Sequence, residues 1–317
     1  MAGAPVLVTG GAGFIGSHLV DALLDLDAEV RVLDDLSTGL ASNLAHCRDR
    51  IEFIEGDLRS TSDVARACQA RRYVFHQAAL GSVPRSMKDP GTTIAVNVAG
   101  TANLFVGARD AGAQRVVYAS SSSVYGDSPR LPKIEGQEGS PLSPYALSKC
   151  MNEELADTFA RCFDMELVGL RYFNVYGPRQ RPDGPYAAVI PRFFAAALEA
   201  RSPIVHGDGE QSRDFTFVTD AVAANLAAAV SERIDGSATI NVAGGRRTTV
   251  NQLAEAILTL ADSKARPEHQ ADRPGDVKHS LADLSLAASL THWKPTTELE
   301  QGLAASLAHY ESLLETA

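Results

Sequence analysis

The sequence has no apolar run that approaches the length of a membrane span, and its start has no basic or signal-like segment. Four cysteines occur among its 317 residues without close-paired spacing, and neither they nor the eight histidines form a metal-ligand pattern. We therefore expect no membrane partner, no bound metal and a cytoplasmic location, where thiols stay reduced.

Positive charge is also scarce. Lysine and arginine number 29 against 39 aspartates and glutamates, and the formal net charge of −10 argues against nucleic acid or an anionic membrane as a partner. An anionic ligand would then need a local arginine cluster. The composition, with 45% hydrophobic and 21% charged residues, is typical of a globular protein of one large domain or two smaller ones.

Glycine is concentrated in one turn near the start of the chain. Residues 6–8 predict a buried parallel strand, and Gly10, Gly13 and Gly16 follow it, with Gly11 as an alternative first glycine. In a dinucleotide-binding turn, such glycines make the turn, admit a pyrophosphate and let the helix pack on the strand. The helix that begins near Gly13 would offer its free N–H groups to the phosphates.

An acidic residue extends this pattern. Residues 30–33 predict the next strand, and Asp34 stands at its end, eighteen residues after Gly16. A carboxylate there accepts hydrogen bonds from a ribose diol and would repel a 2′-phosphate. NAD is therefore favoured over NADP, although Arg31 lies nearby and leaves that preference open.

Strand and helix patterns alternate through the first half of the chain. Further strands are predicted at 51–55, 73–76 and 115–119, and a sixth ends near Leu170. Such alternation predicts an α/β fold with a doubly wound parallel (Rossmann) sheet, which binds ligands beyond the carboxyl ends of its strands. We expect an NAD-binding domain at 1–178 and a smaller substrate lobe at 179–317, with some segments that return to the first domain.

Polar residues follow the fifth strand and open the next helix. Serines occupy positions 120–123, and Tyr145 and Lys149, four residues apart, share one face of the helix predicted at 143–163. An ammonium beside the phenol, near a positively charged nicotinamide, would lower the pKa of Tyr145 from about 10 toward working pH. A serine hydroxyl would complete a set that handles the proton of a substrate hydroxyl. A surface Tyr–Lys pair and a flexible serine turn are the alternatives.

The glycine turn, the serine run before residues 124–126 and the Tyr145–Lys149 pair together resemble the extended short-chain dehydrogenase/reductase family over essentially the whole chain. The resemblance implies a tightly held NAD that transiently oxidises a nucleotide sugar. It places the catalytic serine at Ser121, and Ser122 becomes a secondary contact.

Cofactor contacts are implied after each predicted strand. Small residues after the fourth strand would let a cofactor lie close against the backbone, whereas for Asp57 and Leu58 an ordinary surface turn is an equal alternative. The implied contacts are Gly10, Gly13, Phe14, Ile15, Gly16, Asp34, Asp57, Leu58, Gln77, Ala78, Ala79, Asn97, Lys149 and Tyr172.

The reaction type depends on the residues that follow Ser121. Dehydratases of the family have an Asp-Glu pair directly after the catalytic residue, and related decarboxylases have a glutamate in the same turn. This chain has Ser122 and Ser123 there. The absence of acidic groups favours epimerisation at C4 through a transient 4-keto sugar.

The resemblance also implies how a UDP-sugar is held. Arg213 and Arg273 match a pyrophosphate clamp, for which their donor forks are suited, and Asp276 matches a ribose-binding acid. The implied substrate contacts are Ser82, Arg85, Ser121, Ser122, Tyr145, Asn174, Ala188, Val189, Arg213, Arg273, Asp276 and Ser280.

Ser280 bears on the choice of sugar. The resemblance places this position beside the sugar's 2-position, where a small residue leaves room for an N-acetyl group, and residues 81–86 resemble epimerases that prefer UDP-N-acetylglucosamine. A UDP-glucose or UDP-glucuronate 4-epimerase, a related decarboxylase and a non-catalytic NAD-binding regulator stay open. Family likeness further implies a homodimer through helices at 92–112 and 143–163.

Overall fold

The central element is a seven-stranded parallel sheet. The computed structural model describes residues 1–182, 187–271 and 278–315. Its large sheet has the strand order β11-β6-β5-β4-β1-β2-β3, and every neighbouring pair is parallel. The strands are β1 (Pro5–Thr9), β2 (Glu29–Asp34), β3 (Glu52–Glu55), β4 (Tyr73–His76), β5 (Arg115–Ser121), β6 (Glu166–Tyr172) and β11 (Ser237–Val242).

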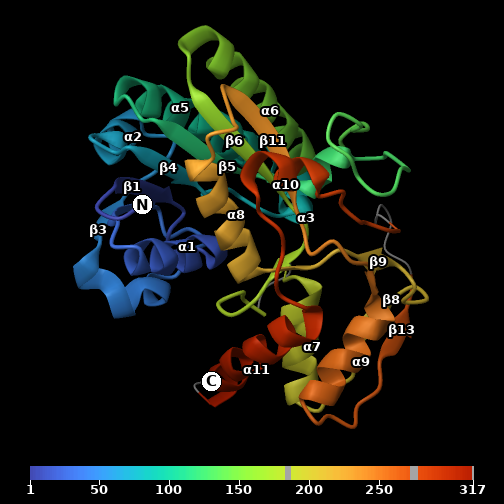
Figure 1. Ribbon diagram of the computed structural model, residues 1–317. Helices are drawn as coiled ribbons and strands as arrows, with labels where there is room; N and C mark the ends of the chain where they lie inside the picture. The colour runs from blue at the N-terminus through green and yellow to red at the C-terminus, as the bar shows by residue number, and fades with distance from the viewer. Residues whose placement is uncertain (183–186, 272–277, 316–317) are drawn as a thin grey trace.

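The strands are apolar on both faces because helices cover both. Along β1, Val6 and Val8 face one core and Leu7 faces the other, and all three are fully buried. The first core also contains residues of α1 (Phe14–Asp25), α8 (Val218–Val230) and α10 (Ser285–Thr291); the second contains residues of α2 (Thr61–Cys68), α5 (Gly100–Asp110) and α6 (Pro144–Phe163). The expected doubly wound α/β fold is confirmed (Figure 1).

The helical segment expected at 92–112 consists of three consecutive pieces. It comprises α4 (Pro90–Ile94), a π-helical turn η2 (Ala95–Ala99) and α5, after the short α3 (Val83–Lys88). Asn97 lies in the π turn, a feature common near functional sites. The helix expected at 143–163 is α6, which begins after Ser143, whose hydroxyl accepts a hydrogen bond from the Ala146 N–H.

Two segments after Arg179 belong to the large sheet: α8 packs on one face of it, and β11 extends it beside β6. Residues 237–242 begin with small and polar side chains, so they lack the apolar run that signals a buried strand. Each of these residues nevertheless pairs with a residue of β6, from Leu167 to Tyr172. Tertiary context, rather than local sequence, makes this segment a strand.

A separate apolar core lies beyond the carboxyl edge of the sheet. It is built from α7 (Val189–Leu198), α9 (Val250–Leu260) and α11 (Leu299–Glu315), which Figure 1 shows grouped below the sheet. Three small two-stranded sheets accompany it: β7 (Val175–Tyr176) with β10 (Thr216–Phe217), β8 (Ile204–His206) with β13 (Glu268–Gln270), and β9 (Ser212–Arg213) with β12 (Thr248–Thr249). None of the helices in the described ranges has the length and apolar character that crossing a bilayer requires.

Candidate active site

A cavity of about 590 Å³ opens at the carboxyl edge of the sheet. Strand order reverses between β1 and β4, and this is the point at which open α/β sheets bind ligands. The lining includes most of the residues expected from the sequence: Gly10, Gly13, Phe14, Ile15, Gly16, Asp34, Asp57, Leu58, Gln77, Ala78, Ala79, Ser121, Ser122, Tyr145, Lys149, Tyr172, Asn174 and Ala188.

The glycine turn forms the floor where a dinucleotide would approach. Gly10 has φ +68°, and a Cβ there would lie 2.6 Å from the backbone nitrogen of Ala78. A Cβ on Gly16 would lie 2.1 Å from the carbonyl oxygen of Gly10, so α1 packs directly against the turn. Gly13 caps α1 without a side-chain hydrogen bond, which leaves the helix N–H groups for phosphate oxygens. The turn therefore fits the pyrophosphate of NAD.

Asp34 ties the loop after β2 to the glycine turn. Its Oδ2 accepts a hydrogen bond from the Ala12 N–H and its Oδ1 from the Leu36 N–H, both at 2.9 Å. Burial raises the pKa of this carboxyl above its ordinary value. Each oxygen keeps a further acceptor position, as a ribose diol needs. Contact with the ribose stays a prediction.

The catalytic candidates come from β5 and α6. Lys149 Nζ donates to the Ala119 carbonyl oxygen at 2.7 Å and lies 6.0 Å from the centre of the Tyr145 ring. Burial lowers the pKa of Lys149 to about 8, and the nearby charge of Glu153 acts in the opposite direction. Ser121 Oγ accepts a hydrogen bond from the Ser123 N–H at 3.1 Å. Serine, phenol and ammonium therefore line one wall of the cavity.

The pKa of Tyr145 differs from the sequence-based expectation. Burial raises it above the ordinary value, and only a hydrogen bond with Ser121 opposes that shift. The protein's own groups therefore do not lower the pKa of the phenol. The expected lowering requires an additional positive charge, which the oxidised nicotinamide of NAD provides.

A closed hydrogen-bond network fixes the wall beside Tyr172. Asn225 of α8 donates to the Tyr172 hydroxyl at 2.7 Å and accepts from the Gln77 amide at 3.0 Å. The Tyr172 hydroxyl in turn donates to Oε1 of the Gln77 side chain at 3.2 Å. Sequence reasoning missed Asn225 because it stands 148 residues from Gln77 with no motif around it.

Asn97 is buried behind the cavity. Its Oδ1 accepts from the Leu80 N–H at 2.8 Å, and its Nδ2 donates to the Ser148 hydroxyl at 3.1 Å. Leu80 lines the cavity, whereas Asn97 is not among the lining residues. Asn97 thus connects the loop after β4 to α6, and its direct contact with a cofactor stays a prediction.

Several expected substrate residues lie outside the cavity lining, namely Ser82, Arg85, Val189, Arg213 and Ser280. Ser82 instead caps α3 by accepting from the Arg85 N–H. Ser280 connects to the cavity through one residue: its hydroxyl accepts from the Asp214 N–H at 3.3 Å, and the Asp214 carbonyl accepts from the Asn174 amide at 2.9 Å. Arg273 and Asp276 lie outside the described residues.

Other lining residues were not anticipated. The loop after β2 contributes Asp35, Ser37, Thr38, Gly39, Leu40 and Asn43. The segment after β7 contributes Arg179, Gln180 and Arg181. Both segments follow strands at the same edge as the glycine turn, and that position is the signal that would have pointed to them.

Comparison with known proteins decides the family. The model of the NAD dependent epimerase/dehydratase family matches residues 6–243. The chain belongs to this family.

Its relatives act on several sugars. A putative UDP-glucose 4-epimerase of Methanocaldococcus jannaschii is 38% identical over 300 residues, which are 94% of this chain and 95% of the relative. The structure of a UDP-N-acetylglucosamine 4-epimerase from Methanobrevibacter ruminantium M1, in complex with UDP-N-acetylmuramic acid, has a TM-score of 0.94 and 40% identity and covers 99% of this chain and 100% of that one. A UDP-glucuronic acid 4-epimerase from Bacillus cereus, in complex with UDP-glucuronic acid and NAD, has a TM-score of 0.90 and 32% identity and covers 98% and 99%.

These findings confirm the expected family, an enzyme of the nucleotide-sugar epimerase type and NAD as cofactor. They do not distinguish among the sugars. The residues of the cavity suit the cofactor at two places: the glycine turn suits its pyrophosphate, and the wall of Tyr145, Lys149 and Tyr172 suits its nicotinamide.

Proposed function

We propose that the protein interconverts UDP-N-acetylglucosamine and UDP-N-acetylgalactosamine by inverting C4. The observation that carries this proposal is the grouping of Ser121, Tyr145 and Lys149 in one cavity wall, with no carboxylate directly after Ser121. NAD, which the glycine turn, Asp34 and Tyr172 would hold, would supply the acceptor and donor of the C4 hydride.

Tyr145 moves the proton. Its phenolate oxygen takes the proton of the C4 hydroxyl as the C4 carbonyl forms, and gives it back when the carbonyl is reduced. Ser121 orients the same hydroxyl by hydrogen bonding. Lys149, held on the Ala119 carbonyl, would orient the nicotinamide end of the site, and the phenolate would be favoured chiefly by the positive charge of the oxidised nicotinamide, to which the ammonium adds.

The serine turn disfavours elimination of water. Water loss from a 4-keto sugar needs an acid and a base beside the neighbouring carbons, and positions 122 and 123 carry hydroxyls instead of carboxyls. The 4-keto sugar therefore has one productive fate, which is reduction. To show its other face, the sugar must turn while its diphosphate stays fixed.

Diphosphate binding is assigned to arginines of the substrate lobe. We place Arg213 and Arg273 on the diphosphate, Asp276 on the uridine ribose, and Ala188 and Val189 at the entry of α7 on the uridine side. Asn174 supports this placement because it lines the cavity and holds the Asp214 carbonyl next to Arg213. A guanidinium fork matches phosphate oxygens and offsets the acidic net charge locally.

Acceptance of an N-acetyl group is supported by two observations. Ser280 is small, and the relative from Methanobrevibacter ruminantium carries the name UDP-N-acetylglucosamine 4-epimerase. We also propose a cytoplasmic homodimer. It would form through the helical segments at 92–112 and 143–163, where Val106 of α5 and Leu147 and Met151 of α6 are exposed. The exposed Val83 and Met87 of α3, which adjoins α6, would extend this surface.

Substrate identity is tested by incubating the purified protein with UDP-N-acetylglucosamine, without added cofactor, and separating the products. We expect UDP-N-acetylgalactosamine to appear, and UDP-glucose to be converted with a lower kcat/KM. Conversion of UDP-glucose or UDP-glucuronate alone would assign a different sugar. No conversion of any UDP-hexose would favour a non-catalytic NAD-binding regulator.

A further inference from the structure

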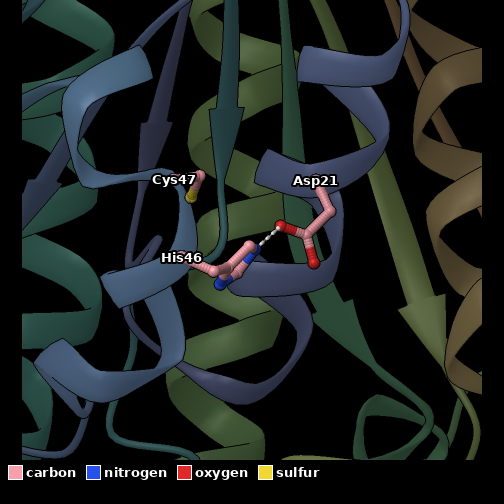
Figure 2. Close-up of side chains that lie close together, drawn as sticks. All are labelled: Asp21, His46 and Cys47. Carbon is pink, nitrogen blue, oxygen red and sulfur yellow. Dashed lines mark hydrogen bonds and ion pairs between the residues drawn. The ribbon is translucent and has the colours of Figure 1, made fainter.

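Three side chains with different donor atoms meet on the surface beside α1, away from the serine–tyrosine wall. Asp21 lies on α1, and His46 and Cys47 lie on the 3-10 segment η1 (Ala41–Arg50). Figure 2 shows the three side chains turned toward one another. His46 Nε2 lies 2.8 Å from Asp21 Oδ1, and the three potential ligand atoms lie within 4.8 Å of one another.

The backbone of η1 helps to bring two consecutive residues to one place. Neighbouring residues in a regular helix point in different directions. At Cys47 the segment departs from helical geometry, with φ −130° and ψ 16°. The Cys47 side chain is buried, while that of His46 is about half exposed. The thiol is thus fixed in place, and the imidazole has freedom to adjust.

Asp21 is held by a partner on its other oxygen. Its Oδ2 forms an ion pair with the Arg179 guanidinium at 2.7 Å. Such outer partners orient metal-binding carboxylates and are a regular part of metal sites. Arg179 also lines the nucleotide cavity, so the cluster and the cavity share one side chain.

We propose that Asp21, His46 and Cys47 form a binding site for a zinc ion, with water as the fourth ligand. Carboxylate, imidazole and thiolate together suit Zn²⁺ and disfavour Ca²⁺ and Mg²⁺, which require oxygen ligands. Tetrahedral Zn²⁺, with bonds of roughly 2.0–2.3 Å, holds its ligand atoms roughly 3.3–3.8 Å apart. The 2.8 Å between His46 Nε2 and Asp21 Oδ1 is shorter than this spacing, so these two atoms must move apart to admit the ion.

Binding replaces two existing interactions. The imidazole nitrogen leaves its hydrogen bond with Asp21, and the Cys47 thiol gives up its hydrogen bond to the Leu44 carbonyl oxygen. The thiol loses its proton to solvent as the zinc–sulfur bond forms. Burial and the Asp21 charge raise the pKa of this thiol above its ordinary value. Affinity therefore rises with pH, by about tenfold for each pH unit at which one proton is released.

Cobalt(II) is the probe for this site, because a cobalt–thiolate bond gives a charge-transfer band in the near ultraviolet. The chelator-treated full chain is titrated with Co²⁺ and then with Zn²⁺. We expect the band to appear with one ion per chain and to vanish when zinc displaces cobalt. The Cys47→Ser variant should lack the band, whereas Cys150→Ser and Cys162→Ser should keep it. His46→Ala and Asp21→Asn should each weaken binding at least about tenfold.

Two results would overturn the proposal: no band in the unaltered chain, or a band that persists in Cys47→Ser. Since Cys47 is buried, its substitution could impair folding, so the exposed His46→Ala variant provides an independent test. Unchanged cobalt affinity in His46→Ala, with an unchanged circular dichroism spectrum, would equally contradict the site. None of these readouts depends on epimerase activity.

Discussion

A largely buried carboxylate, that of Glu153, stands one helical turn beyond Lys149, for which we propose a role in catalysis. Glu153 accepts hydrogen bonds from Arg171 Nε at 3.0 Å and Nη2 at 2.7 Å, and also from the Ser120 hydroxyl. It therefore connects α6 to the end of β5, directly before Ser121. Its negative charge opposes the effect of burial on Lys149. We therefore expect Glu153 to act on the reaction through Lys149 and Ser120, as a positioning residue.

Replacing Glu153 by glutamine should shift the pH profile of kcat. The Lys149 ammonium is present below its pKa of about 8 and is lost as pH rises through that value. Without the Glu153 charge the pKa falls further, so the alkaline limb of the profile should move to lower pH. Arg171 keeps Glu138 as a partner, and we expect a loss of about 1–3 kcal/mol in unfolding free energy.

Kinetic pH profiles and urea unfolding check this expectation. Glu154→Gln is the matched control, because its side chain is exposed on the same helix. The two variants could also show the same alkaline limb in their pH profiles of kcat. That result would show that the charge of Glu153 does not act on Lys149.

At the scale of elements, a buried histidine joins the two strands that flank the switch point. His76, at the end of β4, bonds Thr9 Oγ1 of β1 at 2.7 Å and Thr101 Oγ1 of α5 at 2.9 Å. The Thr9 hydroxyl also accepts from the Ala78 N–H, beside the glycine turn. This chain of hydrogen bonds fixes the edge of the sheet against which we expect the cofactor to bind.

Stability should fall in mild acid because of His76. Burial, with a smaller effect of the Lys149 charge, lowers its pKa to about 3, against 6.5 in the unfolded chain. Below pH 6.5 the unfolded state binds a proton at His76 that the folded state does not. The contribution of neutral His76 to the free energy of unfolding is therefore complete above pH 6.5 and is lost as pH falls toward 3. The expected loss is about 1.4 kcal/mol per pH unit.

Urea unfolding at pH 7 and at pH 5.5 measures the change in the free energy of unfolding between these two pH values. The fall in unfolding free energy from pH 7 to pH 5.5 should be smaller in His76→Asn, which lacks the titrating ring, than in the unaltered chain. An equal decline in both would assign the acid sensitivity to other groups, such as His18 or His309, whose pKa values burial also lowers.

The sequence predicts those elements whose local pattern agrees with their tertiary role. The glycine turn, Asp34, and the Tyr145–Lys149 spacing lie in strands and helices with clear periodicity, and the structure brings them to one cavity. Strand β11 and Asn225 were missed because their role depends on partners more than 50 residues away along the chain. The same holds for Asp21 and Arg179, whose ion pair spans 158 residues.

For the whole molecule, the exposed apolar side chains of α3 and α6 predict the assembly. A patch of this kind on a globular chain marks a partner surface, and the Met87 side chain is 64% exposed. We expect light scattering to give twice the mass of one chain. Met151→Glu should weaken the dimer at least about tenfold, because a buried unpaired carboxylate is costly.

Val230→Glu is the matched control, since Val230 is exposed on α8, on the opposite face of the sheet, and should leave the mass unchanged. A mass of one chain for the unaltered protein at micromolar concentration would contradict the proposed homodimer without affecting the assignment of the site.

The central claim is that the phenol of Tyr145 transfers the C4 hydroxyl proton. Its most direct test compares the unaltered chain with Tyr145→Phe, with UDP-N-acetylglucosamine turnover and substrate binding measured on the same preparations. Removal of one hydroxyl should lower kcat by at least about 100-fold and leave the Kd for the UDP-sugar nearly unchanged. Turnover by Tyr145→Phe at the unaltered rate would contradict the account.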